Sequence, residues 1–362
     1  MPYYSSMDLF NIFRNWLKKM KFKLFSVLLC AMLFMTNHAR AADGLHVINV
    51  RGKVMCGTNL SAPALVSKTE DGRWKGFDAD ICQAFSLAIF GQPDKFEMVD
   101  IKANEISKAL RLGKIDVMLG GANISAKADM LSSYTPATLL YYDQQGFLAR
   151  GNKEASSMED FRGAKVCAVA NTADYSNVED FSLRYDLDFS LLPFNSEERA
   201  KQAFLLNRCQ ILTGNRIFLN GVLQTSFENY DPEESEVQLL PEAVALKPSY
   251  ILVAKDNDKL QAIARWIVNA LQLSDLYGIS SANAKVKIGL KNSSQRNLVG
   301  DDSKLWLSFG LNPTWVRQAL SFVGNYGEIY ERNFGKNSSL KLDRAENNYL
   351  KDGGLINPIP FL

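Results

Sequence analysis

The sequence predicts an α/β protein built from two lobes. From Val54 onward, short apolar runs alternate with amphipathic stretches, the pattern of strands connected by helices in α/β layers. The chain has 362 residues, and the 321 that follow the first 41 are too many for one ordinary core but suit two. The sequence changes character over 141–150, and the strand-like segment 247–254 returns the chain, which places crossovers near 146–151 and 246–251. We therefore expect two crossovers between the lobes, which together act as a hinge.

The first 41 residues are expected to be a signal peptide outside the fold. A basic stretch at Lys18–Lys23 leads into an apolar run at Leu24–Met35, and Ala39-Arg40-Ala41 offers the small residues that a signal peptidase recognises. The apolar run is about half of the ~20 residues that span a bilayer, so a retained transmembrane helix is the weaker interpretation. Export to the periplasm is predicted.

The first lobe is expected to contain three strands and two helices. Asp78 is placed to cap the first helix, because its carboxylate can accept free N–H groups of the first turn, and apolar residues then recur on one face up to Ala88. The second helix, through 106–112, ends at Gly113. The strands are expected at 54–58, 95–99 and 115–119.

A smaller α/β lobe is expected to follow, beginning with a helical opening at 157–160. The segment 247–254 resembles a strand and is expected to return the chain to the first lobe. After Leu260 the sequence is largely helical, and the region from Gly324 onward is expected to form an extension packed on the first lobe. The second lobe is predicted to have strands at 165–169, 189–193 and 210–213 and a helix near 196–206.

Charge argues against a nucleic-acid-binding protein. The leading segment holds six of the 41 basic residues and one of the 39 acidic residues, so the remaining chain carries 35 bases and 38 acids. Neither a basic stripe for nucleic acid nor a polybasic patch for anionic lipid remains.

Four cysteines follow the leading segment, in a chain expected to enter an oxidising compartment. They predict two disulfides, for which three pairings are possible, and none shows the C-x-x-C spacing of a metal or redox site. His46 is the one histidine left, so a zinc site or a histidine-based dyad would have to be built around it. We predict no metal and no cofactor. The cysteines are Cys56, Cys82, Cys167 and Cys209.

Several motifs resemble the solute-binding proteins of polar amino-acid ABC importers, family 3. They are Gly76–Ile81 (GFDADI), Gly113–Met118 (GKIDVM) and Tyr141–Phe147 (YYDQQGF). Gly324–Asn333 (GNYGEIYERN) and the four cysteine positions are similar, more narrowly, to the general L-amino-acid-binding subfamily. The resemblance covers about 50–360 and depends on the order and spacing of the motifs.

The resemblance implies a periplasmic-binding-protein fold of type II, in which two crossover strands form a hinge and the ligand is held between the lobes. This fold fits the boundaries expected from the residues: a signal peptide at 1–41, a first lobe at 42–148 and 249–362 with a C-terminal helical extension, and a second lobe at 149–248. The resemblance pairs Cys56 with Cys82 and Cys167 with Cys209. It also implies a periplasmic, non-enzymatic protein that binds a small polar ligand, an amino acid or a derivative, and presents it to an ABC permease in the inner membrane.

The ligand site is where the sequence departs from this family. A zwitterion in a closed cleft needs a bidentate cation for its carboxylate and an anion for its ammonium. In the resembled family an Arg and an Asp supply them, but the aligned positions here are Ala128 and Asn215. Losing one partner of such a charge pair costs ~2–5 kcal/mol, which weakens binding roughly 30- to 4,000-fold.

The other ligand positions implied by the resemblance are uncharged. Leu65 takes the place of an aromatic residue that stacks on the ligand, and Thr172 keeps one hydroxyl of an anion-binding turn. Gly120 and Gly121 are expected to let the backbone approach the ligand. The expected ligand-binding residues are Leu65, Gly120, Gly121, Asn123, Ser125, Ala128, Thr172 and Asn215.

Three accounts of this pocket stay open. In the first, the pocket is rebuilt for a less charged ligand that is held by neutral hydrogen bonds and by Arg216. In the second, a local misalignment hides the charged pair, and Lys127 and Asp129, which flank Ala128, are the candidate substitutes. In the third, the protein has lost its ligand and keeps its fold to contact another protein.

The leading hypothesis is a binding module for import, whose lobes close on a ligand that contacts both of them. A periplasmic dehydratase or hydrolase is the enzymatic alternative. It would need an acid and a base of shifted pKa facing the cleft, and the segments expected to line the cleft offer few titratable groups.

Overall fold

The structure, a computed structural model, describes residues 44–59, 62–120, 130–151, 157–227, 236–284, 293–299 and 304–361. They belong to one compact unit, Asp43–Leu362. The expected signal peptide lies outside the described residues. No described helix has both the length and the apolar character needed to cross a bilayer.

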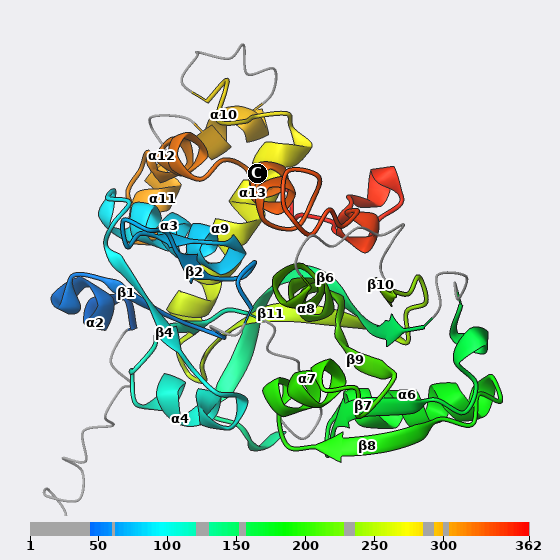
Figure 1. The fold of residues 1–362 in the computed structure, drawn as a ribbon. Coiled ribbons are helices and arrows are strands. Elements are labelled where there is room, and N and C mark those ends of the chain that lie inside the picture. The colour runs from blue at the N-terminus through cyan, green and yellow to red at the C-terminus, as the bar shows by residue number, and fades with distance from the viewer. Residues whose placement is uncertain are drawn as a thin grey trace, which may run out of the picture. The chain divides into compact units, whose positions relative to one another are not determined.

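A mixed sheet, nine-stranded within the described residues, runs through this unit (Figure 1). Its order is β4-β1-β5-β11-β6-β9-β7-β8, with β10 also paired to β6. The strands are β1 (Val54–Thr58), β4 (Phe96–Asp100), β5 (Val117–Met118), β6 (Tyr134–Arg150), β7 (Lys165–Val169), β8 (Ser190–Phe194), β9 (Ile211–Asn215), β10 (Val237–Leu239) and β11 (Ala245–Ala254). A separate hairpin is formed by β2 (Ser67–Lys68) and β3 (Trp74–Lys75).

Two parallel groups of strands form the two lobes. In the first lobe β1 pairs in parallel with β4 and β5, and in the second lobe β7 pairs in parallel with β8 and β9. The expected strands are all present within two residues of their predicted positions.

Strands β6 and β11 connect the lobes. They pair antiparallel from Tyr134↔Ala254 to Gln145↔Ala245, and β6 then continues into the second lobe, where it pairs with β9 and β10. A strand of 17 residues reaches about 55 Å, enough to pass through both groups. The predicted two-lobed fold with two crossover strands is confirmed, while the exact domain boundaries stay a prediction.

Helices cover both groups of strands. In the second lobe, α6 and α7 lie with the green strands β7 to β9, and α8 lies beside β6 (Figure 1). In the first lobe α3 packs on β1 and β4, and α9, α12 and α13 pack on α3. The helices are α2 (Gly44–Arg51), α3 (Phe77–Phe90), α4 (Ile106–Arg111), α6 (Ala173–Arg184), α7 (Glu197–Leu205), α8 (Arg216–Ser226), α9 (Asp258–Leu276), α10 (Ser293–Val299), α11 (Lys304–Ser308), α12 (Trp315–Phe322) and α13 (Tyr326–Asn333).

Two disulfides are present, with the pairing that the resemblance implied. Cys56–Cys82 joins β1 to α3, and Cys167–Cys209 joins β7 to the turn before β9. Their Cα atoms are 6.2 Å and 5.8 Å apart, which is normal for a disulfide. Each bridge lies within one lobe.

Asp78 does not cap α3 as the sequence predicted. The residue before this helix is Gly76, and no side chain caps it. The Asp78 carboxylate is instead completely buried, where it accepts a 2.6 Å hydrogen bond from the Thr58 hydroxyl and one from the Gly120 backbone N–H. Burial raises the pKa of Asp78 to about 7, against the lowering effect of these two hydrogen bonds.

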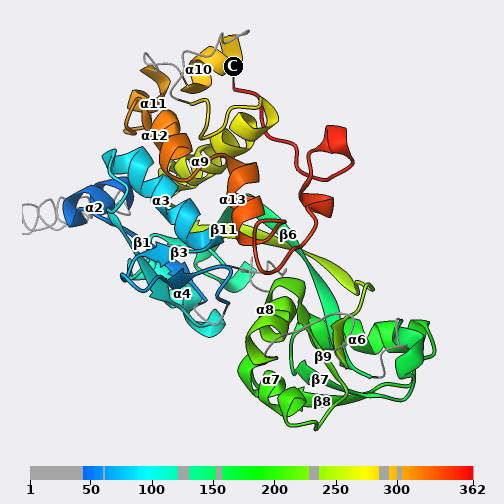
Figure 2. The same ribbon diagram turned by 45° about the horizontal axis from the view of Figure 1, so that its top comes forward.

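The segment 334–361, here called the C-terminal segment, packs on the first lobe and also reaches the crossover (Figure 2). Buried Asn347 accepts a 2.7 Å hydrogen bond from the Tyr142 N–H of β6 and donates a 2.8 Å bond to the Tyr142 carbonyl. The Leu340 carbonyl accepts a 2.8 Å bond from Asn220 of α8. The segment therefore contacts the first lobe, a crossover strand and the second lobe.

Replacing Asn347 with alanine is expected to destabilise the protein by roughly 2–4 kcal/mol, because two buried backbone groups of Tyr142 lose their partner. Asn348→Ala is the matched control, since no described residue bonds that side-chain amide, and its effect should stay within about 0.5 kcal/mol. Urea unfolding measures both. Equal losses in the two variants would contradict the assigned role of Asn347.

The buried Asp78 should make stability depend on pH. Its pKa is higher in the folded chain than the ordinary 3.8, so its stabilising contribution is complete below about pH 4 and is lost as pH rises through about 7. Across that window, unfolding free energies of wild type should fall relative to Asp78→Asn by up to roughly 4 kcal/mol, at about 1.4 kcal/mol per pKa unit. Exposed Asp94→Asn serves as control. Parallel pH profiles for wild type and Asp78→Asn would refute this assignment.

Candidate functional site

The structure describes only some of the expected ligand residues. Gly121, Asn123, Ser125 and Ala128 lie outside the described residues, as do the alternative charges Lys127 and Asp129. Their roles stay predictions.

The first lobe brings Gly120 against Asp78. Gly120 has a φ of +70°, and a Cβ there would approach the Asp78 Oδ2 to 2.5 Å, so only glycine fits without rearrangement. Thr58 ends β1, and Gly120 follows β5 by two residues. Asp78 thus ties together the carboxyl ends of two parallel strands, the edge of an α/β sheet where ligands usually bind.

Leu65 lies in the first lobe, 6% exposed, and its side chain belongs to the hydrophobic core. Its neighbours Ala64 and Ser67 line a cavity described below. The carbonyl of Leu65 lies so close to Gly76 that a Cβ at position 76 would approach it to 2.4 Å. Contact between Leu65 and a ligand stays a prediction.

Thr172 and Asn215 lie at the carboxyl ends of β7 and β9 in the second lobe. The Thr172 hydroxyl caps α6, accepting from the Tyr175 N–H at 3.3 Å and donating to the Val169 carbonyl at 2.6 Å. Asn215 precedes α8 without capping it, and its Oδ1 accepts a hydrogen bond from the Lys247 ammonium. Asn215 is therefore already bonded to a cation.

Lys247 also forms an ion pair that the sequence analysis did not identify. Its Nζ lies 2.7 Å and 2.9 Å from the two carboxylate oxygens of Asp174, in the first turn of α6. The two side chains are only 11% and 18% exposed. Such a pair interacts more strongly than one at the surface, because less water screens it.

Gln145 completes this arrangement from β6, the other crossover strand. Its side chain is fully buried and donates to the Asp174 carbonyl at 2.8 Å and to the Thr213 hydroxyl at 3.2 Å. Its Oε1 accepts a 2.9 Å bond from Asn177. We call the group Gln145, Asp174, Asn215 and Lys247 the Lys247 cluster.

Further acids surround the Lys247 cluster. Burial raises the pKa of Asp143 to about 6, although Lys247 and Arg216 oppose the shift. Burial, together with the Asp174 charge, raises the pKa of Glu197. The second lobe therefore holds more titratable groups at this edge than the sequence analysis expected. Arg216, considered earlier as a ligand residue, donates to the Pro241 carbonyl at 3.1 Å.

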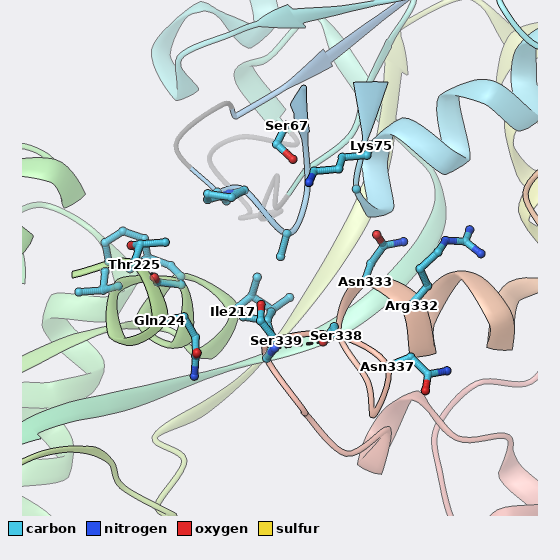
Figure 3. A pocket seen from close by; sticks show the side chains of 18 of the residues that line it. Ser67, Lys75, Ile217, Gln224, Thr225, Arg332, Asn333, Asn337, Ser338 and Ser339 are labelled. Carbon is cyan, nitrogen blue, oxygen red and sulfur yellow. Dashed lines mark hydrogen bonds between the residues drawn. The ribbon is translucent and has the colours of Figure 1, made fainter. Parts of the chain in front are cut away.

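A cavity of about 620 Å³ lies along α8 (Figure 3). Ser67 and Lys75 line it from the first lobe, Ile217 and Gln224 from α8, and Ser338 from the C-terminal segment. Its volume is within the range of ligand sites for small molecules. We call it the α8 cavity. No group of three or more possible metal ligands occurs among the residues that the structure describes.

Sequence reasoning missed Asp174 and Lys247 because they are 73 residues apart and meet only when β11 passes the end of β7. One signal was available: Lys247 is the single charged residue of β11, in a strand otherwise made of uncharged residues.

Comparisons with known proteins identify relatives that are similar over most of the chain. The model of bacterial extracellular solute-binding proteins, family 3, matches residues 54–280. The general L-amino acid-binding periplasmic protein AapJ of Rhizobium johnstonii is 29% identical over 339 residues, covering 93% of this chain and 98% of that protein. The glutamate/glutamine/aspartate/asparagine-binding protein BztA of Rhodobacter capsulatus is 27% identical over 324 residues, covering 89% and 94%.

A solved structure extends the similarity to the fold. It is an ABC transporter/periplasmic binding protein from Brucella ovis with glutathione bound, 32% identical, with a TM-score of 0.80, covering 89% of this chain and all of that one. The type II periplasmic-binding-protein fold implied by the resemblance is thereby confirmed. The chain belongs to the bacterial extracellular solute-binding proteins of family 3.

Proposed function

We propose that this protein is the periplasmic substrate-binding component of an ABC importer and that it collects a small zwitterionic solute, an amino acid or a small peptide. The relatives support this class: AapJ and BztA are amino-acid-binding proteins, and the Brucella protein holds glutathione. The observation that carries the proposal is the Lys247 cluster, which places a cation and an anion beside the expected ligand residues Thr172 and Asn215.

The Lys247 cluster supplies both charges that a zwitterion requires. Asp174 and Lys247 neutralise each other in the free protein, which avoids burying either charge alone. A zwitterion that enters the pair turns its ammonium toward Asp174 and its carboxylate toward Lys247. One ion pair is then replaced by two, and the acid missing at Asn215 is supplied by Asp174. This differs from all three accounts considered from the sequence.

The position of the Lys247 cluster also connects binding to hinge closure. Lys247 and Gln145 belong to the two crossover strands, and Asp174 belongs to the second lobe. A solute held there that also contacts the first lobe, near Gly120, favours the closed form by its differential affinity. A permease in the inner membrane then distinguishes the loaded form from the empty one.

The function proposed here includes no covalent step. The acid and the base that face each other in the Lys247 cluster, Asp174 and Lys247, form an ion pair. A dehydratase or hydrolase would need these groups poised to transfer protons. The named relatives are binding proteins rather than enzymes.

A thermal-shift screen of the protein, purified from the periplasmic fraction of cells that express the full chain, should find a stabilising ligand among glutamate, glutamine, aspartate, asparagine and glutathione. A ligand at about 100 times its Kd stabilises by about 2.7 kcal/mol. If no small zwitterion shifts the transition, the alternative of a ligand-free interaction protein gains support.

Lys247→Gln and Asp174→Asn should each weaken the best ligand roughly 30- to 4,000-fold in isothermal titration calorimetry, because each leaves one ligand charge without its partner. Asp186→Asn is the matched control. It removes an acid from an ion pair in the same lobe, with Arg162, but that acid is 97% exposed. Unchanged affinity in folded Lys247→Gln would eliminate the Lys247 cluster as the binding site.

A further inference from the structure

The α8 cavity lies along the helix that directly follows Asn215 of the Lys247 cluster. Asn215 directly precedes α8, and Ile217, two residues later, is the first α8 residue that lines the cavity. The lining then follows one face of the helix to Thr225. From Ile217 to Thr225 the helix advances about 12 Å, so the lining along α8 is about that long.

The lining of the α8 cavity combines apolar and polar side chains, and it carries one cation without an acidic partner. Figure 3 shows Lys75 and Ser67 on the first-lobe side, across from Gln224 and Thr225 of α8. Of the ionisable lining residues, Arg332 pairs with Asp80 at 2.7 Å and Lys201 pairs with Glu198 at 2.7 Å. Within the described part of the chain, Lys75 has no carboxylate at ion-pair distance, so it is available to an anion.

Besides the first lobe and α8, residues after 280 form a third wall of the α8 cavity. These residues lie beyond the part of the chain, 54–280, that the family model matches. Asn333, Asn337, Ser338 and Ser339 line the cavity with amides and hydroxyls, the groups that bond peptide N–H and C=O. This wall is fixed at both ends. Asn333 donates to Asp80 at 2.7 Å, and the Leu340 carbonyl accepts from Asn220 at 2.8 Å.

The length and chemistry of this space suit a solute larger than one amino acid. Three extended residues span about 10 Å, which matches the distance along α8. Amides and hydroxyls on the walls suit a peptide backbone, and the Lys75 ammonium suits a second carboxylate of the solute.

We infer that the α8 cavity receives the distal part of a peptide-sized, anionic solute whose amino-acid end lies at the Lys247 cluster. The C-terminal segment then sets the size of the solute, because it closes the space that the distal part occupies. This inference rests on the proposed function and specifies its substrate class: short peptides or peptide-like amino-acid derivatives with a second carboxylate.

Calorimetric titration with two probes, glutamate and glutathione, tests the inference on the full chain after export. Wild type should bind glutathione more tightly than glutamate. Lys75→Gln should weaken glutathione about tenfold, because one charged hydrogen bond is lost, and should change glutamate less than about twofold. Gln224→Trp, at an exposed helix position, fills the cavity and should act in the same direction.

Lys68→Gln is the matched control. Lys68 belongs to the same hairpin as Lys75 but does not line the cavity, and its ammonium lies 4.4 Å from the centre of the Trp74 ring. It should bind both probes as wild type does.

The inference is overturned if wild type binds glutamate but not glutathione, if Lys75→Gln weakens both probes equally, or if neither cavity variant changes glutathione binding. Failure of wild type to bind either probe would instead count against the proposed function, and the inference would fall with it.

Discussion

The antiparallel pairing of β6 with β11 is the constraint on which the rest of the structure depends. These two strands belong to both lobes, so each residue on them is positioned relative to both groups of parallel strands. Gln145 and Lys247 occupy this pair where it passes the carboxyl ends of β7 and β9. The same pair determines which side chains of the two lobes meet.

Electrostatics explains how the second lobe tolerates so many buried polar groups. The Lys247 ammonium has three N–H donors, and two carboxylate oxygens of Asp174 and the amide oxygen of Asn215 accept from it. Gln145 bonds the Asp174 backbone and the Thr213 hydroxyl. Buried charges that are paired and hydrogen-bonded cost far less than isolated ones, so the fold can keep both charges largely buried.

The C-terminal segment links the crossover to the second lobe, because it bonds both β6 and α8. Asn347 bonds both backbone groups of Tyr142, which pairs across the sheet with Pro248, a residue that has no N–H to donate. Asn347 thus completes the hydrogen bonding of β6 where the strand passes between the lobes. The segment reaches α8 through Leu340, so any relative movement of the lobes changes its contacts as well.

The sequence by itself determined the alternation of strands and helices, the two lobes and the two crossovers, because periodicity and turn residues act over a few neighbours. The pairing of the cysteines came from the family resemblance. Only the tertiary structure decided the roles of Asp78, Asp174, Lys247 and Asn347. Asp78 looked like a helix cap locally, yet its partner Thr58 is 20 residues away, and Asn347 lies 205 residues from Tyr142. Such contacts depend on how distant strands are brought together, which local sequence patterns do not encode.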